Sequence, residues 1–129
     1  MIVDTSALLA ILLGEEEAAR FASAILDAPS AGISVANVLE TAIVLERRGN
    51  ALARSRLDPL VADLGLAFLP VTVAQMHRAR AAFTRFGKGR HPAGLNFGDC
   101  FAYALAEETG EPLLFKGEDF ARTDIARAL

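Results

Sequence analysis

The sequence predicts a three-layer α/β fold, in which helices cover both faces of a central parallel sheet. Short apolar runs alternate along the chain with longer segments whose apolar residues recur at helical spacing. Such alternation is typical of a parallel sheet, because each helix carries the chain back to the same edge. The 129 residues are 53% hydrophobic but include only eight Phe, one Tyr and no Trp. A mostly aliphatic core in one domain, residues 1–129, is therefore expected.

The first elements follow from the opening residues. The apolar run 1–3 predicts a buried strand that ends at Asp4. Asp4 and the two hydroxyl residues after it can cap a helix over residues 7–13, which Gly14 ends. A second helix is expected to open with the acidic residues 15–17, because the helix dipole favours acids in the first turn.

The middle of the chain repeats this pattern. Residues 31–34 form a second strand candidate, and Ser34 or Asn37 can cap the helix that follows, through about Arg48. Residues 51–64 form another expected helix, which an internal proline can kink or divide.

The last elements complete the alternation. Residues 67–71 predict a third strand, and 72–86 predict a helix. Residues 87–98 hold several glycines and are expected to form a loop. A helix through Thr109 then carries Asp99 in its first turn, and residues 112–115 predict the fourth strand.

Charge is distributed unevenly, although the net charge is only −3. No acidic residue occurs between Asp63 and Asp99, and this stretch holds most of the candidate phosphate ligands. They are Arg78, Arg80, Arg85, Lys88 and Arg90, with His77 and His91 beside them. A polarised surface of this kind steers charged partners.

Composition also limits the class of protein. The single Cys cannot form an internal disulfide, and no apolar run approaches the ~20 residues that a membrane span needs. Together with the lack of a secretory signal at the start, this favours a cytoplasmic protein that has no membrane partner.

Acidic residues are the candidates for chemistry. Asp4 and Asp119 follow expected strands and Asp99 opens a helix, so all three are expected at the edge where ligands of parallel sheets bind. Glu40 lies in a helix that is apolar almost all round, which predicts that it is buried and needs a cation as partner. Converging carboxylates select Mg²⁺, Mn²⁺ or Ca²⁺, and the lack of paired His or Cys disfavours zinc. Taken singly, the three Asp residues could equally be a helix cap, a first-turn acid and a loop residue.

Four motifs carry a resemblance to a known family. They are MIVDTSAL at 1–8, ETA at 40–42, LNFGDC at 95–100 and LLFKGEDF at 113–120. In this order and spacing they resemble the PIN-domain family, and more narrowly the VapC toxins of bacterial toxin–antitoxin pairs. The resemblance implies a PIN-like α/β/α fold and a metal-dependent endoribonuclease.

The resemblance also implies roles for individual residues. Asp4, Glu40 and Asp99 match the core acids, which would be both catalytic and metal-binding. Asp119 matches the fourth acid best, with Asp124 as a rival close by. Ser6 and Asn96 match polar positions that support such a site.

Partners and mechanism follow as hypotheses. The resemblance implies a cognate VapB-like antitoxin, whose helix lies in a groove between the early apolar helices, and a homodimer. Water activated by Mg²⁺ or Mn²⁺ would attack an RNA phosphodiester, while Arg85, Lys88 and Arg90 hold the RNA backbone. Two alternatives stay open: a phosphohydrolase that uses Asp4 as its nucleophile, and a catalytically silent partner-binding module.

Overall fold

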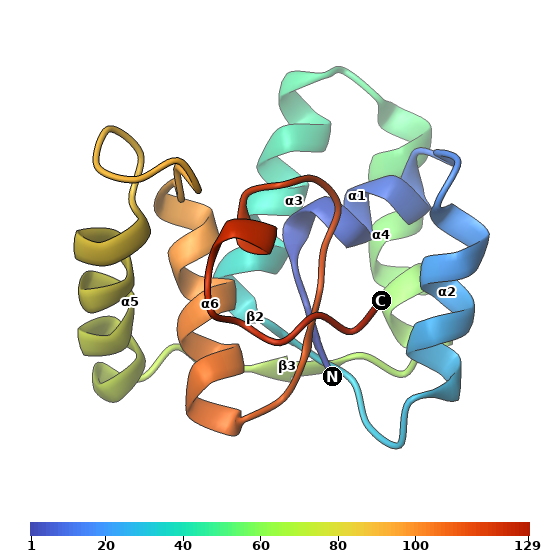
Figure 1. Ribbon diagram of the computed structural model, residues 1–129. Helices are drawn as coiled ribbons and strands as arrows, with labels where there is room; N and C mark the ends of the chain where they lie inside the picture. Colours follow the sequence, from blue (N-terminus) through green and yellow to red (C-terminus); the bar gives the residue numbers. More distant parts are fainter.

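A four-stranded parallel sheet forms the centre of the computed structural model, which describes residues 1–129 (Figure 1). Its strands lie in the order β3-β2-β1-β4 and are parallel throughout. Their bounds are β1 Ile2–Val3, β2 Gly32–Ser34, β3 Ala67–Leu69 and β4 Leu113–Leu114. The central β1 pairs with both β2 and β4, so the segments that follow β1 and β4 leave the sheet side by side.

Six α-helices and one short 3₁₀ helix surround the sheet. They are α1 Thr5–Leu12, α2 Ala18–Asp27, α3 Val35–Arg47, α4 Ala51–Asp63, α5 Val73–Phe86, α6 Phe97–Thr109 and η1 Phe120–Arg122. Neighbouring strand residues point to opposite faces, as the pleat requires. Val3 and Leu114 thus join the core formed with α1 to α4, whereas Ile2 and Leu113 join the core formed with α5 and α6. This arrangement confirms the predicted three-layer fold.

Local capping accounts for most differences at the element ends. Asn96 caps α6 and forms a capping box with Asp99, so this helix begins at Phe97, within the expected loop. The acidic residues before α2 precede the helix rather than open it. Helix α4 continues through Pro59 as one element. No helix is long and apolar enough to cross a membrane.

The prediction that the third helix is largely buried is wrong. The buried residues of α3 are spaced four apart and lie on one face of the helix: Asn37, Thr41 and Leu45. Two of these three side chains are polar. The apolar residues on the outward face of α3 are exposed by about two-fifths or more: Val35 (42%), Leu39 (61%) and Ile43 (41%). Asn37 points inward and bonds to α6, and Thr41 donates to the Asn37 carbonyl oxygen within α3 itself. Glu40 lies beside this inward face and is only half-buried.

Candidate acid pocket

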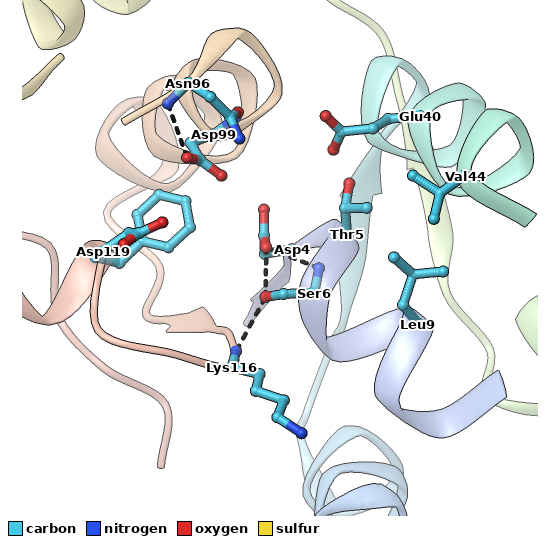
Figure 2. Close-up of a pocket in the computed structure, with 11 residues that line it drawn as sticks. Asp4, Thr5, Ser6, Leu9, Glu40, Val44, Asn96, Asp99, Lys116 and Asp119 are labelled. Atoms are coloured by element: carbon cyan, nitrogen blue, oxygen red, sulfur yellow. Dashed lines mark hydrogen bonds between the residues drawn. The ribbon is translucent and has the colours of Figure 1, made fainter. Parts of the chain in front are cut away.

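A pocket of about 270 Å³ opens where the ends of β1 and β4 meet α3 and the first turn of α6. Its lining includes four carboxylates from distant parts of the chain: Asp4, Glu40, Asp99 and Asp119 (Figure 2). The structure therefore brings together the acids that the sequence singles out. Asp4 and Asp119 come after the parallel strands β1 and β4, which end at one edge of the sheet, whereas Glu40 and Asp99 come from α3 and α6.

Asp4 is held by a chain of hydrogen bonds. Its Oδ2 accepts from the Ser6 backbone N–H at 2.8 Å and from the Ser6 hydroxyl at 2.6 Å. The Ser6 oxygen in turn accepts from the backbone N–H of Lys116, just after β4, at 3.0 Å. Asp4 Oδ1 is buried and has no hydrogen-bond partner, and in Figure 2 the free oxygen points into the pocket. Ser6, which the sequence predicts to support the site, thus contacts Asp4 directly.

Burial dominates the electrostatics of Asp4. The side chain is 3% exposed, and this burial raises its pKa from 3.8 to about 6, although the Ser6 hydrogen bonds oppose the change. The nearby Glu40 carboxylate adds a smaller increase. Because burial makes the ionised form of Asp4 unfavourable, a bound cation would stabilise this carboxylate.

Asp99 is positioned by the cap of its own helix. Asn96 Oδ1 accepts from the Asp99 backbone N–H, and Asp99 Oδ2 accepts from the Asn96 backbone N–H, both at 2.9 Å. The pKa of Asp99 is raised from 3.8 to about 7, mainly by burial, although the hydrogen bond from the Asn96 backbone N–H opposes this change. The negative charges of Asp4, Asp119 and Glu40 make smaller contributions to the same increase. Asn96 is therefore a supporting residue that acts through the helix cap.

The remaining two acids reach the pocket from more open positions. Glu40 packs against Gly98, where a Cβ atom added to the glycine would lie 1.7 Å from Glu40 Oε2. Asp119 is exposed and precedes η1. The expectation that Glu40 is largely buried is therefore wrong, but its carboxylate does face the pocket (Figure 2).

Asp124, the rival for the fourth acid, lies outside the pocket lining. Its Oδ1 accepts from the Tyr103 hydroxyl at 2.6 Å, and its Oδ2 pairs with Arg85 at 3.1 Å. The Tyr103 hydrogen bond is the main reason that the pKa of Asp124 is lowered. The structure therefore brings Asp119, and not Asp124, to the other three carboxylates.

The basic segment is only partly free to bind a ligand. Arg85 is tied to Asp124 and also lies over the Phe86 ring, 4.6 Å from its centroid. Lys88 and Arg90 are exposed and make no ion pair. They belong to the loop that leads into Asn96 at the pocket, so two unpaired basic side chains lie close to Asp99 in the sequence.

The donor set fits a hard divalent cation. All four acids offer oxygen ligands, one of them the unpartnered Asp4 Oδ1, and the raised pKa values of Asp4 and Asp99 reflect a pocket that disfavours negative charge. As the side chains stand, no three of them form a group that could hold an ion. The acids would therefore have to move closer together to hold a cation.

Sequence reasoning missed three residues at this site. Lys116 lines the pocket and extends its ammonium away to Glu15 and Glu17, at 2.5 and 3.0 Å. Asn37 and Gly98 join α3 to α6, which carry Glu40 and Asp99. The available signal was a polar Asn on an apolar helix, one turn before Glu40.

Comparisons with known proteins identify the family of this chain. The PIN domain family model matches residues 1–126. The chain is 49% identical over 126 residues to a Ribonuclease VapC of Mycolicibacterium smegmatis, which covers 98% of both chains. It is 48% identical over 130 residues to Ribonuclease VapC28 of Mycobacterium tuberculosis, which covers 100% of this chain and 98% of that one.

Solved structures support the fold. The crystal structure of Mycobacterium tuberculosis VapC20, described as a sarcin-ricin loop cleaving toxin, superposes with a TM-score of 0.77 at 19% identity, over 97% of this chain and 95% of that one. A toxin–antitoxin complex from Klebsiella pneumoniae gives 0.72 at 18% identity, over 95% and 92%. The family resemblance predicted from the four motifs is confirmed, and this chain belongs to the PIN-domain family, among the VapC ribonucleases.

Proposed function

We propose that the acid pocket of this ribonuclease toxin holds Mg²⁺ or Mn²⁺ and cleaves RNA phosphodiester bonds at that site. The enzyme class, a hydrolase that acts on RNA, follows from membership of the VapC ribonucleases. The observation that carries the metal dependence is Asp4 Oδ1, a buried oxygen without a partner among three other carboxylates. Burying a carboxylate oxygen without a partner destabilises the fold unless a cation or a hydrogen-bond donor binds to it.

The protein's own residues prepare the pocket for a cation. When bound, the cation would supply Lewis-acid chemistry and lower the pKa of a coordinated water. Asp4, Glu40, Asp99 and Asp119 would hold it. Because Asp4 and Asp99 have pKa values of about 6 and 7, they lose protons as the cation binds, and cation affinity should rise with pH through this range.

Basic side chains would hold the RNA backbone. Lys88 and Arg90 are exposed and unpaired on the loop before Asn96. Arg85 lies in the last turn of α5, where a phosphate would compete with Asp124 for its guanidinium. Phosphate contacts of this kind fix the register of a nucleic acid without reading its sequence. We therefore assign these three residues to positioning the scissile phosphodiester.

An apolar wall of the pocket suits the antitoxin. Leu9 of α1 and Val44 of α3 line the pocket beside the carboxylates. An antitoxin helix lying between α1 and α3 could cover both residues and place a cationic side chain among the acids. Replacing Val44 by Glu should then weaken inhibition by the cognate antitoxin, and unchanged inhibition would argue against this docking site.

A second copy of the chain is the proposed occupant of the hollow between α5 and α6. This hollow measures about 580 Å³, and Met76, Phe83 and Phe97 leave much of their apolar surface exposed around it. Exposed apolar surface on this scale marks an interface. Sedimentation of the wild type and of Phe83→Glu tests the dimer, and a wild type that stays monomeric at micromolar concentration would argue against it.

The decisive experiment follows cleavage of total cellular RNA with and without divalent cation. The wild type should cleave in Mg²⁺ or Mn²⁺ and lose activity in EDTA, whereas Asp99→Ala should be inactive but folded. Asp58→Ala, which removes an exposed acid from α4, is the matched control and should remain active. Full activity of Asp99→Ala would refute the proposed site.

Two further measurements, trapping of a phosphorylated intermediate and a metal-binding titration, separate the alternatives. A phosphohydrolase that uses Asp4 as its nucleophile would form an aspartyl-phosphate that can be trapped. At the position where such enzymes usually carry a second Asp, this chain has Ser6, whose hydroxyl instead bonds to Asp4. A silent binding module would bind no cation and leave RNA intact.

A further inference from the structure

Asn37 is a fully buried amide at the junction of three elements, and it does not line the acid pocket. Its Nδ2 donates to Thr5 Oγ1 in α1 at 3.2 Å and to the carbonyl oxygen of Gly98 in α6 at 3.1 Å. Its own backbone carbonyl accepts from the Thr5 hydroxyl at 3.3 Å and from the Thr41 hydroxyl at 2.8 Å. One side chain of α3 therefore joins α1 to α6.

Each of these contacts lies beside an acid of the pocket. Thr5 is the neighbour of Asp4 in the chain, and Gly98 is the neighbour of Asp99. Glu40 follows Asn37 by three residues, which places both on the same side of α3. The Asn37 contacts thus connect the three segments that carry the three most enclosed carboxylates.

Gly98 contributes to this junction because the absence of a side chain leaves room for the Glu40 carboxylate. The three atoms nearest to an added Cβ all belong to the Glu40 carboxylate: Oε2 at 1.7 Å, Cδ at 2.4 Å and Oε1 at 2.6 Å. Gly98 does not have the positive φ that would itself require glycine. Since alanine is otherwise favoured over glycine within a helix, the close approach of Glu40 is the reason for glycine here.

Stability alone does not account for Asn37. Its Oδ1 is buried without a hydrogen-bond partner, and an unsatisfied amide oxygen destabilises a core. A buried apolar residue of similar size would avoid that cost. The amide is therefore better explained by what its Nδ2 holds in place.

We propose that Asn37 and Gly98 are positioning residues that set the separation of Glu40 from Asp4 and Asp99, and thereby the affinity of the pocket for a divalent cation. Neither residue lines the acid pocket, and the inference rests on the proposed metal-dependent function. Residues that orient metal ligands typically contribute about 10- to 100-fold in metal affinity.

A double-mutant cycle between Gly98→Ala and Glu40→Ala tests the glycine, with Mn²⁺ affinity measured by calorimetry and thermal unfolding measured in EDTA. In the wild-type background, Gly98→Ala should weaken Mn²⁺ binding about tenfold or more and lower the melting temperature. In the Glu40→Ala background, the added methyl group has room. The double mutant should bind Mn²⁺ with an affinity within about twofold of that of Glu40→Ala alone, and its melting temperature should be no lower than that of Glu40→Ala.

Asn37→Leu tests the amide independently. It keeps a buried side chain of similar size but removes both Nδ2 hydrogen bonds, so Mn²⁺ affinity should fall by about 10- to 100-fold. The matched control is Asn50→Leu, which removes the Asn50 side chain's hydrogen bond to the backbone N–H of Ala53 at the start of α4. The control should lower the melting temperature and leave Mn²⁺ affinity unchanged.

The outcomes separate this inference from the function on which it rests. If the wild type binds no Mn²⁺, the proposed function fails. If the wild type binds Mn²⁺ but Gly98→Ala has equal effects in both backgrounds, or fails to fold in both, the positioning role is wrong. Folding of Gly98→Ala only when Glu40 is absent would support it, and unchanged Mn²⁺ affinity in Asn37→Leu would overturn the role of the amide.

Discussion

Replacing Asp4 by Asn should make the metal-free protein more stable at pH 8 while removing its affinity for Mn²⁺. The carboxylate of Asp4 is buried and ionised at this pH, and one of its oxygens has no partner. An amide keeps the oxygen that accepts the Ser6 hydrogen bonds and removes the charge. Its Nδ2 would face the other carboxylates of the pocket, which can accept a hydrogen bond.

The magnitude follows from the pKa of Asp4, which burial raises from 3.8 to about 6. Between these values the folded state binds the proton more tightly than the unfolded state, so stability falls as pH rises through this range and is constant above it. The difference corresponds to about 3 kcal/mol at pH 8. For a domain of this size, the melting temperature of Asp4→Asn should exceed that of the wild type by about 10 °C.

Thermal unfolding followed by circular dichroism in EDTA measures this directly. At about pH 4.5 the advantage of Asp4→Asn should shrink to about 1 kcal/mol, because most of the wild-type side chain is then protonated in the folded state. Added Mn²⁺ should raise the melting temperature of the wild type but not of Asp4→Asn. Asp58→Asn, an exposed acid on α4, is the control and should change little at either pH.

A melting temperature of Asp4→Asn at or below that of the wild type at pH 8 would refute this reasoning. It would mean that ionised Asp4 is already compensated in the metal-free protein. The case for a cation at Asp4 Oδ1 would then lose its physical basis.

Two further predictions concern the RNA-binding residues and the fourth acid. Replacing Arg85, Lys88 and Arg90 together by Gln should weaken RNA binding and flatten its dependence on log salt by about 0.7 for each phosphate that is no longer neutralised; an unchanged slope would make them ordinary surface residues. Asp119→Asn should weaken Mn²⁺ binding, whereas Asp124→Asn should leave it unchanged and cost about 1 kcal/mol of stability from its weakened side-chain bonds. The reverse ranking in a calorimetric titration would restore Asp124 as the fourth acid.

Local sequence determined the order and type of the elements. Periodicity, caps and glycine stops depend on neighbours within a few residues, so strands and helices could be placed close to their final bounds. The expectation that Asp4 and Asp119 share an edge also followed locally, because each comes after a strand and parallel strands end together. Asp99 joined this set as an acid in the first turn of a helix, and Glu40 joined it as a lone carboxylate on an apolar helix. The family motifs then matched these residues to the core acids.

Tertiary structure decided which side chains face which partners. The helix with Glu40 looked buried because its residues are apolar, yet Leu39 is 61% exposed while Asn37 is fully buried. Composition cannot show this, since burial depends on which elements pack against a helix. Likewise, Asp119 and Asp124 lie close together in sequence, and only the Tyr103 hydroxyl and the Arg85 guanidinium, which come from other helices, draw Asp124 away from the pocket. The sequence alone thus determined the fold and the supply of acids, while contacts between distant segments decided which acids share the pocket and what holds them there.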